Sequence, residues 1–461
     1  MLKTSAWFVV SFVVCGCASI GVRSPSPVAP AREGHARAAA AAAAAPAADE
    51  RGAAAALAPG AQAVLAAASE DELVRLALEH SPRMAAARAA RDAARGERWQ
   101  SALLPNPVGV AESEEIPEGG GPKRGVWTIG VEQTLPTSPR RYLGAASAKA
   151  GERAAAHSLD AVARDVTAEV REARLELLFR RRAAALSRAA LETALAARTA
   201  AAIRADVGAG AAADTLRAAV LASRAGLALR EAEAALLAAG HAVRVAVGVP
   251  SLDTESIAGE LPLDLPAVDS DEAVRCYVAE SPALLAAGAA ADAAYLRARS
   301  ERWSLLPEPS VRAAWGRDGE SDEDLWQAGV AIEIPLFDRH QGAALAASGE
   351  ARAREAEARG LEASGAAELR ALGARYEMWR AESRRLAAET VPAARLYAER
   401  ADEGYREGRL DLVALLDAQD TLAEAELLAL ETRREAAVAL VRIESLAGPS
   451  CRSAWIGGDE R

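Results

Sequence analysis

The fold is decided by a short step that the chain contains twice, LLPNPVGVAES at residues 103–113 and LLPEPSVRAAW at residues 305–315. Each step leaves an alanine-rich segment through a Pro-x-Pro pair and enters an alternating apolar run. The two copies lie much further apart than the roughly 20–50 residues of a solenoid repeat. The sequence therefore predicts a duplicated half-molecule.

The flanks of the two steps support the duplication. DELVRLALEHSPRM from Asp71 is matched by DEAVRCYVAESPAL from Asp271, and VWTIGVEQTLPTS from Val126 is echoed by LWQAGVAIEIPLF from Leu325. Four landmarks recur in the same order: Ser81-Pro82 with Ser281-Pro282, Trp99 with Trp303, Pro105-Pro107 with Pro307-Pro309, and Pro136 with Pro335. We place a first repeat at residues 69–268, a second at 269–450 and a C-terminal tail at 451–461.

The N-terminus predicts export. Residues 1–16 contain a lone Lys3, an apolar stretch and the run Val14-Cys15-Gly16 before Cys17, which resembles a bacterial lipoprotein signal peptide with lipid attachment at Cys17. An ordinary signal peptide cleaved nearby is the alternative, and either one exports the chain. Residues 17–68 are rich in alanine and proline without apolar periodicity, and we interpret them as a tether.

Composition narrows the possible partners and the packing. The formal net charge of −11 provides no basic surface for nucleic acid. Only 4% of the residues are aromatic, so a thick hydrophobic core is not expected. Beyond Cys17, Cys276 and Cys451 remain in a compartment that permits disulfides, but the sequence leaves their pairing open.

Two hairpins of strands follow the Pro-x-Pro steps, at about residues 107–135 and 308–335. In the first, Trp127, Ile129 and Val131 alternate with polar and small residues, and the second alternates in the same way. Strands of about ten residues suit a tilted crossing of a bilayer. Trp127, Trp315 and Trp326 lie beside the turns, where an aromatic girdle is expected. A half-buried soluble hairpin is the alternative.

A very long helix is predicted after each hairpin, over residues 140–207 and 341–405. Each would extend on the order of 100 Å. A glycine-containing turn follows each, VGAGAAAD from Val207 and EGYREGRLD from Glu403, before a return helix of roughly 35 residues. The helix before each hairpin and the return helix together have nearly the length of one long helix. We expect the small difference in length to lie at a waist of the molecule.

The number of strands predicts assembly. Four strands cannot close a barrel, and open strand edges are not tolerated in lipid. Two chains would give eight strands, whose interior side chains fill, whereas three chains would give twelve and a lumen. The sequence therefore favours a trimer.

This arrangement resembles the TolC family of outer membrane factors. The resemblance covers nearly the whole mature chain and is carried by ALEHSPRM with LLPNP, by AESPALL with LLPEPS, and by YREGRLDLVALLDAQDTLAEAELLAL from Tyr405. It implies a mainly α fold in which three chains share a twelve-stranded membrane β-barrel on a long periplasmic α-helical barrel. The run LPTSPRR after the first hairpin is more similar to the heavy-metal-efflux branch.

The resemblance also implies positions for a periplasmic gate. Tyr405 matches the tyrosine that helps to hold the entrance closed, and Asp417 matches one of two aspartates that ring the constriction. The companion position is Ala414 here, so Asp411 or Asp420 is a candidate substitute. We expect the two turns at the hairpin ends to dock an adaptor, with these residues forming the tips: Gly208, Gly210, Asp214, Gly404 and Gly408.

The implied function is that of an outer membrane channel, a passive exit duct for metal ions or small toxic compounds. Its partners would be a periplasmic adaptor and an inner membrane pump of the resistance-nodulation-division type. Enzymatic activity, a cofactor and a resident metal site are not predicted, because the five histidines are scattered and no HExxH, Walker or GxSxG pattern occurs. A type I secretion duct and a lipid-anchored coiled-coil surface protein are the alternatives.

Overall fold

The computed structural model describes residues 69–114, 125–207, 211–263, 265–448 and 450–456. All of them belong to one compact unit, Val64–Arg461. The predictions for the signal peptide, for Cys17 and for the tether lie outside the described residues.

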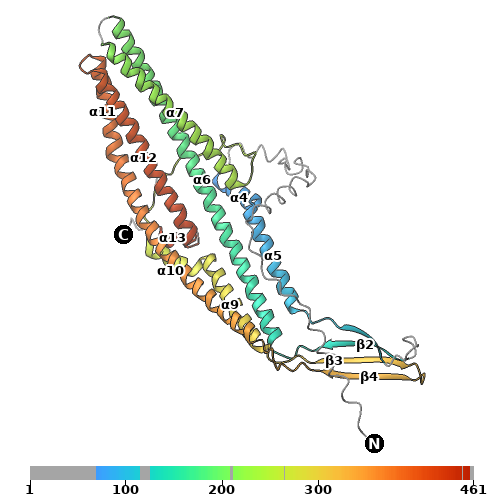
Figure 1. Ribbon diagram of the computed structural model, residues 1–461. Coiled ribbons are helices and arrows are strands. Elements are labelled where there is room, and N and C mark those ends of the chain that lie inside the picture. Colours follow the sequence, from blue (N-terminus) through green and yellow to red (C-terminus); the bar gives the residue numbers. More distant parts are fainter. Residues whose placement is uncertain (1–68, 115–124, 208–210, 264, 449, 457–461) are drawn as a thin grey trace, which may run out of the picture. The chain divides into compact units, whose positions relative to one another are not determined.

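The same order of elements occurs twice along the chain (Figure 1). The first series is α4 (Glu70–His80), α5 (Pro82–Ala102), β1 (Val108–Glu114), β2 (Val126–Thr134), α6 (Arg140–Asp206) and α7 (Ala212–Val247). The second is α8 (Ser270–Glu280), α9 (Pro282–Trp303), β3 (Ser310–Asp318), β4 (Asp324–Ala331), α10 (Gln341–Arg385), η3 (Leu386–Thr390), α11 (Val391–Arg406) and α12 (Leu412–Ala447), with α13 (Arg452–Trp455) behind it. The recurrence agrees with the duplicated landmarks in the sequence.

The serine–proline steps divide the first helical segment of each series into two. Ser81 and Ser281 are extended, with ψ of 128° and 119°, because the proline ring that follows disfavours helical backbone in the residue before it. Pro82 and Pro282 then occupy the first turn of α5 and α9, where no backbone N–H is needed. Ser69 caps α4, since its Oγ accepts from the backbone N–H of Glu72 at 3.3 Å.

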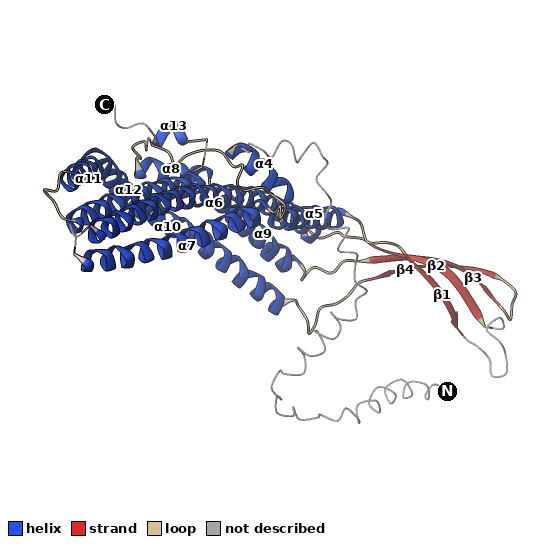
Figure 2. Ribbon diagram, turned by 90° about the horizontal axis from the view of Figure 1, so that it is seen from above, coloured by secondary structure: helices blue, strands red, loops and turns tan. Residues whose placement is uncertain are grey.

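The four strands form one antiparallel sheet in the order β1-β2-β3-β4, beyond the ends of the helices that lead to it (Figure 2). Its register gives each face a distinct character. One face carries the apolar residues Trp127, Ile129, Val131, Val311, Ala313, Trp315, Trp326, Ala328 and Val330. The other face is more polar. It carries Glu112, Thr128, Glu132, Arg312 and Gln327 together with small residues and the apolar Val108, Val110, Val126 and Leu325. The alternation predicted for both hairpins is therefore confirmed.

The helices pack lengthwise around α6 and α10. The 67-residue helix α6 contacts α5, α7, α9 and α12, while α10 contacts α8, α9 and α12 (Figure 1). The shorter helices of the first series meet at the serine–proline step, because Gly248 at the end of α7 lies against His80 and Ser81. There Gly248 has a φ of +75°, and a Cβ would come within 3.1 Å of the His80 carbonyl oxygen. This junction occupies the place where the sequence predicted a waist.

The buried core is a series of clusters along the helices. One joins α8, α10, α12 and α13 around Tyr277, Tyr376 and Trp455, each at most 2% exposed. Another joins the ends of α6, α7, α11 and α12 and consists mainly of alanine and leucine with Tyr405. Small side chains let the helices approach closely, so a chain with few aromatic residues can still bury its helix faces.

The structure refines two predicted elements. The second predicted long helix is helical from Gln341 to Arg406, but it contains a π-helical turn, Leu386–Thr390, between α10 and α11. Pro392 follows it and cannot donate a backbone hydrogen bond, and the wider turn accommodates this loss. The second hairpin was predicted to reach residue 335, but β4 pairs with β3 only as far as Ala331.

Among the residues that the structure describes, no helix is both long enough and apolar enough to cross a membrane.

Gly365 on α10 provides a test of the close helix contact with α8. A Cβ at Gly365 would overlap the ring of Tyr277, which is 2% exposed and donates from its hydroxyl to the Leu361 carbonyl oxygen at 3.0 Å. We expect Gly365→Ala to lower the stability of the protein by about 1–3 kcal/mol through overpacking. Thermal unfolding followed by circular dichroism measures this change.

Gly360→Ala, on the same helix, is the matched control. Gly360 is exposed and has open space around a Cβ, so alanine should raise stability by up to about 1 kcal/mol. Equal shifts of the two variants in the same direction would contradict the assigned contact.

Candidate functional sites at the hairpin ends and on the sheet

The turn between α11 and α12 is held by a compact set of backbone hydrogen bonds. Gly408 adopts a φ of +75°, and its N–H donates to the Tyr405 carbonyl oxygen at 3.1 Å. The N–H groups of Arg409 and Leu410 both donate to the Gly404 carbonyl oxygen, at 2.8 and 3.0 Å. A Cβ on Gly404 would lie 2.8 Å from the Leu410 side chain, so the close approach requires glycine there.

Asp411 is the N-cap residue of α12. Its carboxylate accepts a hydrogen bond from the Ala414 backbone N–H at 2.9 Å, which caps the helix. The sequence proposed Asp411 as a possible substitute for the missing gate aspartate. The structure places it instead at the helix start, where its carboxylate satisfies a backbone donor.

Tyr405 joins the two helical hairpins of the chain. Its side chain is 7% exposed and packs in the cluster formed by α6, α7, α11 and α12. Arg204 on α6 lies with its guanidinium 4.2 Å from the centre of the Tyr405 ring, and its Nη2 donates to the Tyr405 carbonyl oxygen at 3.2 Å. This Arg204–Tyr405 clasp holds α11 against α6 through a cation–π contact and a hydrogen bond.

Asp417 and Asp420 lie one turn apart on α12 but have different neighbours. Asp417 is exposed and accepts a hydrogen bond from the Tyr397 hydroxyl on α11 at 3.1 Å. That hydrogen bond, together with desolvation and the Asp417 charge, raises the pKa of Tyr397. Asp420 lines a groove on the side of α12 that faces α6 and α7. The two carboxylates therefore make different contacts within a single chain, although they are close enough for their charges to interact.

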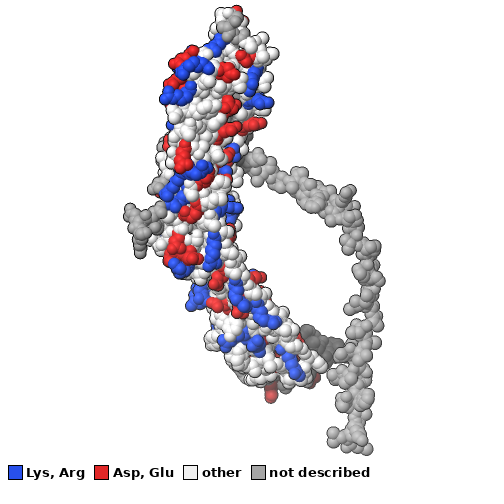
Figure 3. Space-filling model, turned by 90° about the vertical axis from the view of Figure 1, so that its left-hand side faces the viewer, with Lys and Arg blue, Asp and Glu red and all other residues white. Residues whose placement is uncertain are grey.

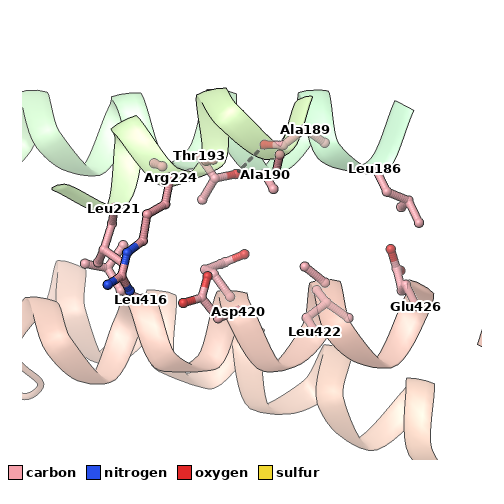
Figure 4. A pocket seen from close by; sticks show the side chains of 15 residues that line it. Leu186, Ala189, Ala190, Thr193, Leu221, Arg224, Leu416, Asp420, Leu422 and Glu426 are labelled. Atoms are coloured by element: carbon pink, nitrogen blue, oxygen red, sulfur yellow. Dashed lines mark hydrogen bonds between the residues drawn. The ribbon is translucent and has the colours of Figure 1, made fainter. Parts of the chain in front are cut away.

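The groove separates the α6–α7 hairpin from α12 and has a volume of about 360 Å³ (Figure 4). Arg224 extends into it from α7, towards the side that carries Asp420 (Figure 4). Burial raises the pKa of Asp420, and the charges of Glu424 and Asp417 raise it further, while Arg224 opposes them. The partly desolvated carboxylate of Asp420 thus lies where the two helical hairpins face each other.

The first hairpin end is described only in part. Gly208 and Gly210 lie outside the described residues, so their predicted roles stay predictions. Asp214 lies in the first turn of α7, where its N–H donates to the Ala211 carbonyl oxygen at 3.0 Å. Thr215 Oγ1 donates to the Ala201 carbonyl oxygen of α6 at 3.4 Å, which ties the two helices together near this end.

The sheet brings together the three tryptophans that the sequence proposed as a girdle. Trp127 and Trp315 form an edge-to-face pair with ring centres 5.4 Å apart, and Trp326 lies opposite Trp315 in the register of β3 and β4. All three occupy the apolar face, and Trp326 is 80% exposed in the single chain. The three rings gather towards the turn end of the sheet, and their role as a girdle at a membrane interface stays a prediction.

An ion pair crosses the polar face of the sheet. Arg312 on β3 donates to Glu112 on β1, at 2.7 Å for Nη1 and Oε1, over the intervening strand β2. The residues that lie beneath this pair on β2 and β3 are small, as at Gly130 and Gly316, which leaves room for the long side chains. The polar face therefore carries a charged pair in the middle of the sheet, whereas the Arg317–Asp324 pair of the apolar face lies at its turn end.

Acidic and basic side chains are interspersed along the helices on the face drawn in Figure 3. Several of these charges form pairs between neighbouring helices, as Arg395 of α11 does with Glu426 of α12 at 2.9 Å. Such exposed pairs contribute little stability each, but they keep the outer helix surface hydrated. Within the described part of the chain, no cluster of three or more histidine, cysteine or acidic side chains could hold a metal ion.

Three contact residues escaped the sequence analysis, namely Arg204, Tyr397 and Arg224. Each is one of many similar residues on a helix rich in arginine or alanine, and its partner comes from another helix. Helical periodicity identifies a face but does not identify the residue opposite it.

Comparison with known proteins agrees with this architecture. Residues 277–449 match the family described as outer membrane efflux protein. The cobalt-zinc-cadmium resistance protein CzcC of Cupriavidus metallidurans is 28% identical over 163 residues, which cover 35% of this chain and 39% of CzcC. The matched part thus spans about two fifths of that relative.

Solved structures show the same fold at low sequence identity. The outer membrane channel OprN aligns with a TM-score of 0.71 and 22% identity, over 82% of this chain and 89% of OprN. The outer membrane protein VceC of Vibrio cholerae aligns with a TM-score of 0.70 and 18% identity, over 82% of this chain and 96% of VceC. These matches confirm the predicted mainly helical fold, and the family match of residues 277–449 agrees with the predicted resemblance to outer membrane factors.

The Arg204–Tyr405 clasp leads to a prediction about local opening. Arg204→Met keeps much of the apolar length but removes both the cation–π contact and the hydrogen bond, together worth about 1 kcal/mol or more. Amide hydrogen exchange over residues 398–412 should then accelerate roughly fivefold. The exposed Arg198, on the same helix, provides the control Arg198→Met. An equal acceleration in both variants would assign the effect to the loss of charge alone.

Proposed function

We propose that the chain is the outer membrane exit duct of a tripartite efflux system and that three copies form it. The observation that carries this proposal is the four-stranded sheet with one apolar face, one polar face and two outer strands that each pair on one side only. A sheet of this kind can cross a bilayer once its outer edges are paired, with the apolar face towards lipid and the polar face towards water.

The strand count supports three copies. The outer strands β1 and β4 would pair with β4 and β1 of neighbouring copies, which removes every edge. Eight strands from two copies would enclose only enough space for side chains, whereas twelve strands leave a lumen. The Glu112–Arg312 pair and Gln327 would then line that lumen.

The helices supply the part of the duct that we assign to the periplasm. α6 has 67 residues, and α10, η3 and α11 run one after another on the other side, which gives each hairpin a reach on the order of 100 Å. We place the adaptor at the hairpin ends, around Gly404, Gly408 and Asp214. In the same region the Arg204–Tyr405 clasp and Asp417 are our candidates for the gate.

The exported compounds are proposed to be metal ions or other small toxic compounds. This assignment rests on the similarity to CzcC, whose name records resistance to cobalt, zinc and cadmium. An inner membrane pump, of the resistance-nodulation-division type, would supply the energy, and lipid at Cys17 would provide a second anchor in the outer membrane. The duct itself would carry out no bond chemistry.

Reconstitution into planar bilayers tests the channel directly. The purified protein should give discrete conductance steps and should migrate as a trimer on gels until heated. A lipid-anchored surface stalk predicts neither behaviour, so a monomer without conductance would contradict the proposed duct.

Variants at two adjacent residues of β4 test which face of the sheet meets lipid. Ala328 lies on the apolar face and Gln327 on the polar face, and both are exposed in the single chain. Arginine at Ala328 should reduce membrane assembly, since a lipid-facing arginine near the bilayer midplane costs about 2–4 kcal/mol. Gln327→Arg should assemble normally and shift the selectivity towards anions.

Asp417 provides the test of the gate. Three copies of this exposed carboxylate close to one axis would attract cations, as acidic rings in ion channels do. We expect Asp417→Ala to lower cation selectivity and to weaken block by multivalent cations while the trimer still assembles. Tyr397→Phe is the control, because it removes the hydrogen bond to Asp417 but keeps the charge. Unchanged selectivity and block in Asp417→Ala would remove Asp417 from the gate.

A further inference from the structure

The segment that follows α12 in the sequence folds back along α8. Asp269 at the start of α8 donates from its N–H to the Trp455 carbonyl oxygen at 2.9 Å, and Val268 and Ile456 form an antiparallel bridge. At the other end of α8, the Ser450 hydroxyl contacts the Glu280 carboxylate. Residues 450–456 therefore run antiparallel to α8, fixed at both of its ends.

This path brings the two cysteines of the described chain together. Cys276 lies four residues before Glu280 and so occupies the same face of α8, one turn away. Cys451 follows Ser450, which touches Glu280. Cys276 is 5% exposed in the cluster around Trp455, and Cys451 packs against that same cluster.

The thiols also interact directly. Burial raises the pKa of Cys276 to about 12, and a side-chain hydrogen bond with Cys451 contributes to that rise. The Ser450–Glu280 contact and the shared cluster around Trp455 make the two cysteines neighbours, and both thiols are free in this structure.

We propose that Cys276 and Cys451 form a disulfide that fixes the C-terminal segment to α8 in the exported protein. Its formation rests on the export that belongs to the proposed function, because only an oxidising compartment keeps such a bond. The juxtaposition of the two residues is independent of that function. The crosslink would join the first helix of the second repeat to the segment that follows its last helix.

The oxidant in this proposal is a disulfide-bearing oxidoreductase of the compartment to which the protein is exported. The Cys451 thiolate attacks the oxidant's disulfide, which breaks that bond and leaves a mixed disulfide and one oxidant thiol. The Cys276 thiolate then attacks the Cys451 sulfur, forming the Cys276–Cys451 bond and releasing the second oxidant thiol. The two electrons and two protons of the protein thiols thus reduce the oxidant's disulfide to two thiols.

Reactivity sets the order of events. A buried thiol with a raised pKa is a poor nucleophile, whereas Cys451 is only partly buried. The second step is therefore favoured before α8 packs fully, during folding. Once formed, the bond would lie at the cluster around Trp455, where the burial of Cys276 shields it from exchange.

The first repeat shows which residue fills the position equivalent to Cys276 where no crosslink is present. In the alignment of the two repeats, Leu76 of α4 stands where α8 has Cys276, and it is 7% exposed. Apolar packing alone fills the site there. Cysteine at the second site is thus not demanded by burial, and its partner Cys451 gives it a separate role.

Peptide mapping of the full-length protein purified from the envelope tests the proposal. Free thiols are blocked at lysis in denaturant, because the folded Cys276 would escape the reagent, and the digest is analysed with and without reductant. We expect a linked peptide pair containing Cys276 and Cys451 that separates on reduction. Both cysteines recovered as blocked thiols from protein in the membrane fraction would overturn the disulfide and leave the proposed duct standing.

Thermal unfolding adds a second readout. Reductant should lower the unfolding temperature of the wild-type protein, and the double variant Cys276→Ser with Cys451→Ser should unfold at one temperature with or without reductant. Cys451→Ser alone, at the partly exposed position, keeps the buried thiol in place and should match the reduced wild type. A wild type that does not respond to reductant in denaturing scans would contradict a crosslink. Bilayer conductance of the same samples reports on the duct independently.

Discussion

The outer edges of β1 and β4 are the constraint on which the proposed assembly depends. Each of these strands pairs with another described strand on one side only. One face of the sheet is apolar, and Trp326 on that face is 80% exposed. Backbone donors and acceptors left unpaired in lipid cost several kcal/mol each, so this sheet is unsuited to a bilayer as a monomer. In the proposed trimer, pairing between copies would satisfy the edges and enclose the polar face in one step. The Glu112–Arg312 ion pair would then lie in water, where it needs no further partner, and the apolar residues would meet lipid.

The helical part depends on a different constraint, the small size of its contact residues. Glycine at Gly365 admits the ring of Tyr277, and Gly248 admits the backbone of the α4–α5 junction. These approaches let two short helices, placed end to end, cover one long helix with a layer one helix thick. Core clusters then form wherever a larger side chain is available, as Trp455 and Tyr405 show. Charged residues cover the rest of the helix surface, so a chain with few aromatic residues can be both long and stable.

The sequence predicted most of the fold because its decisive signals are local. Proline after Ser81 and Ser281 ends one helix and begins another whatever lies nearby, and alternation in the strands assigns each residue to a face. The π-helical turn before Pro392 was missed because a proline alone does not specify how the helix accommodates it. The partners within the candidate sites were missed for a second reason. The Arg204–Tyr405 clasp, the bond from Tyr397 to Asp417 and the pair of Cys276 with Cys451 each join residues far apart in sequence, and only the packing of whole helices decides them.

The two repeats are not equivalent, and the difference lies in the long helical segment of the second repeat. The first hairpin consists of uninterrupted α6 and α7, whereas the second contains the π-helical turn and Pro392 between α10 and α11. Both features weaken the regular helix hydrogen bonding at one place in the second hairpin. Beyond this turn, Arg204 ties α11 to α6, and α12 faces α7 across the groove that contains Asp420. If the gate that we propose opens at this end of the helices, bending at the π-helical turn would break the Arg204–Tyr405 clasp and widen the groove. The two halves of the chain, alike in their order of elements, thus differ in the regularity of their long helical segments.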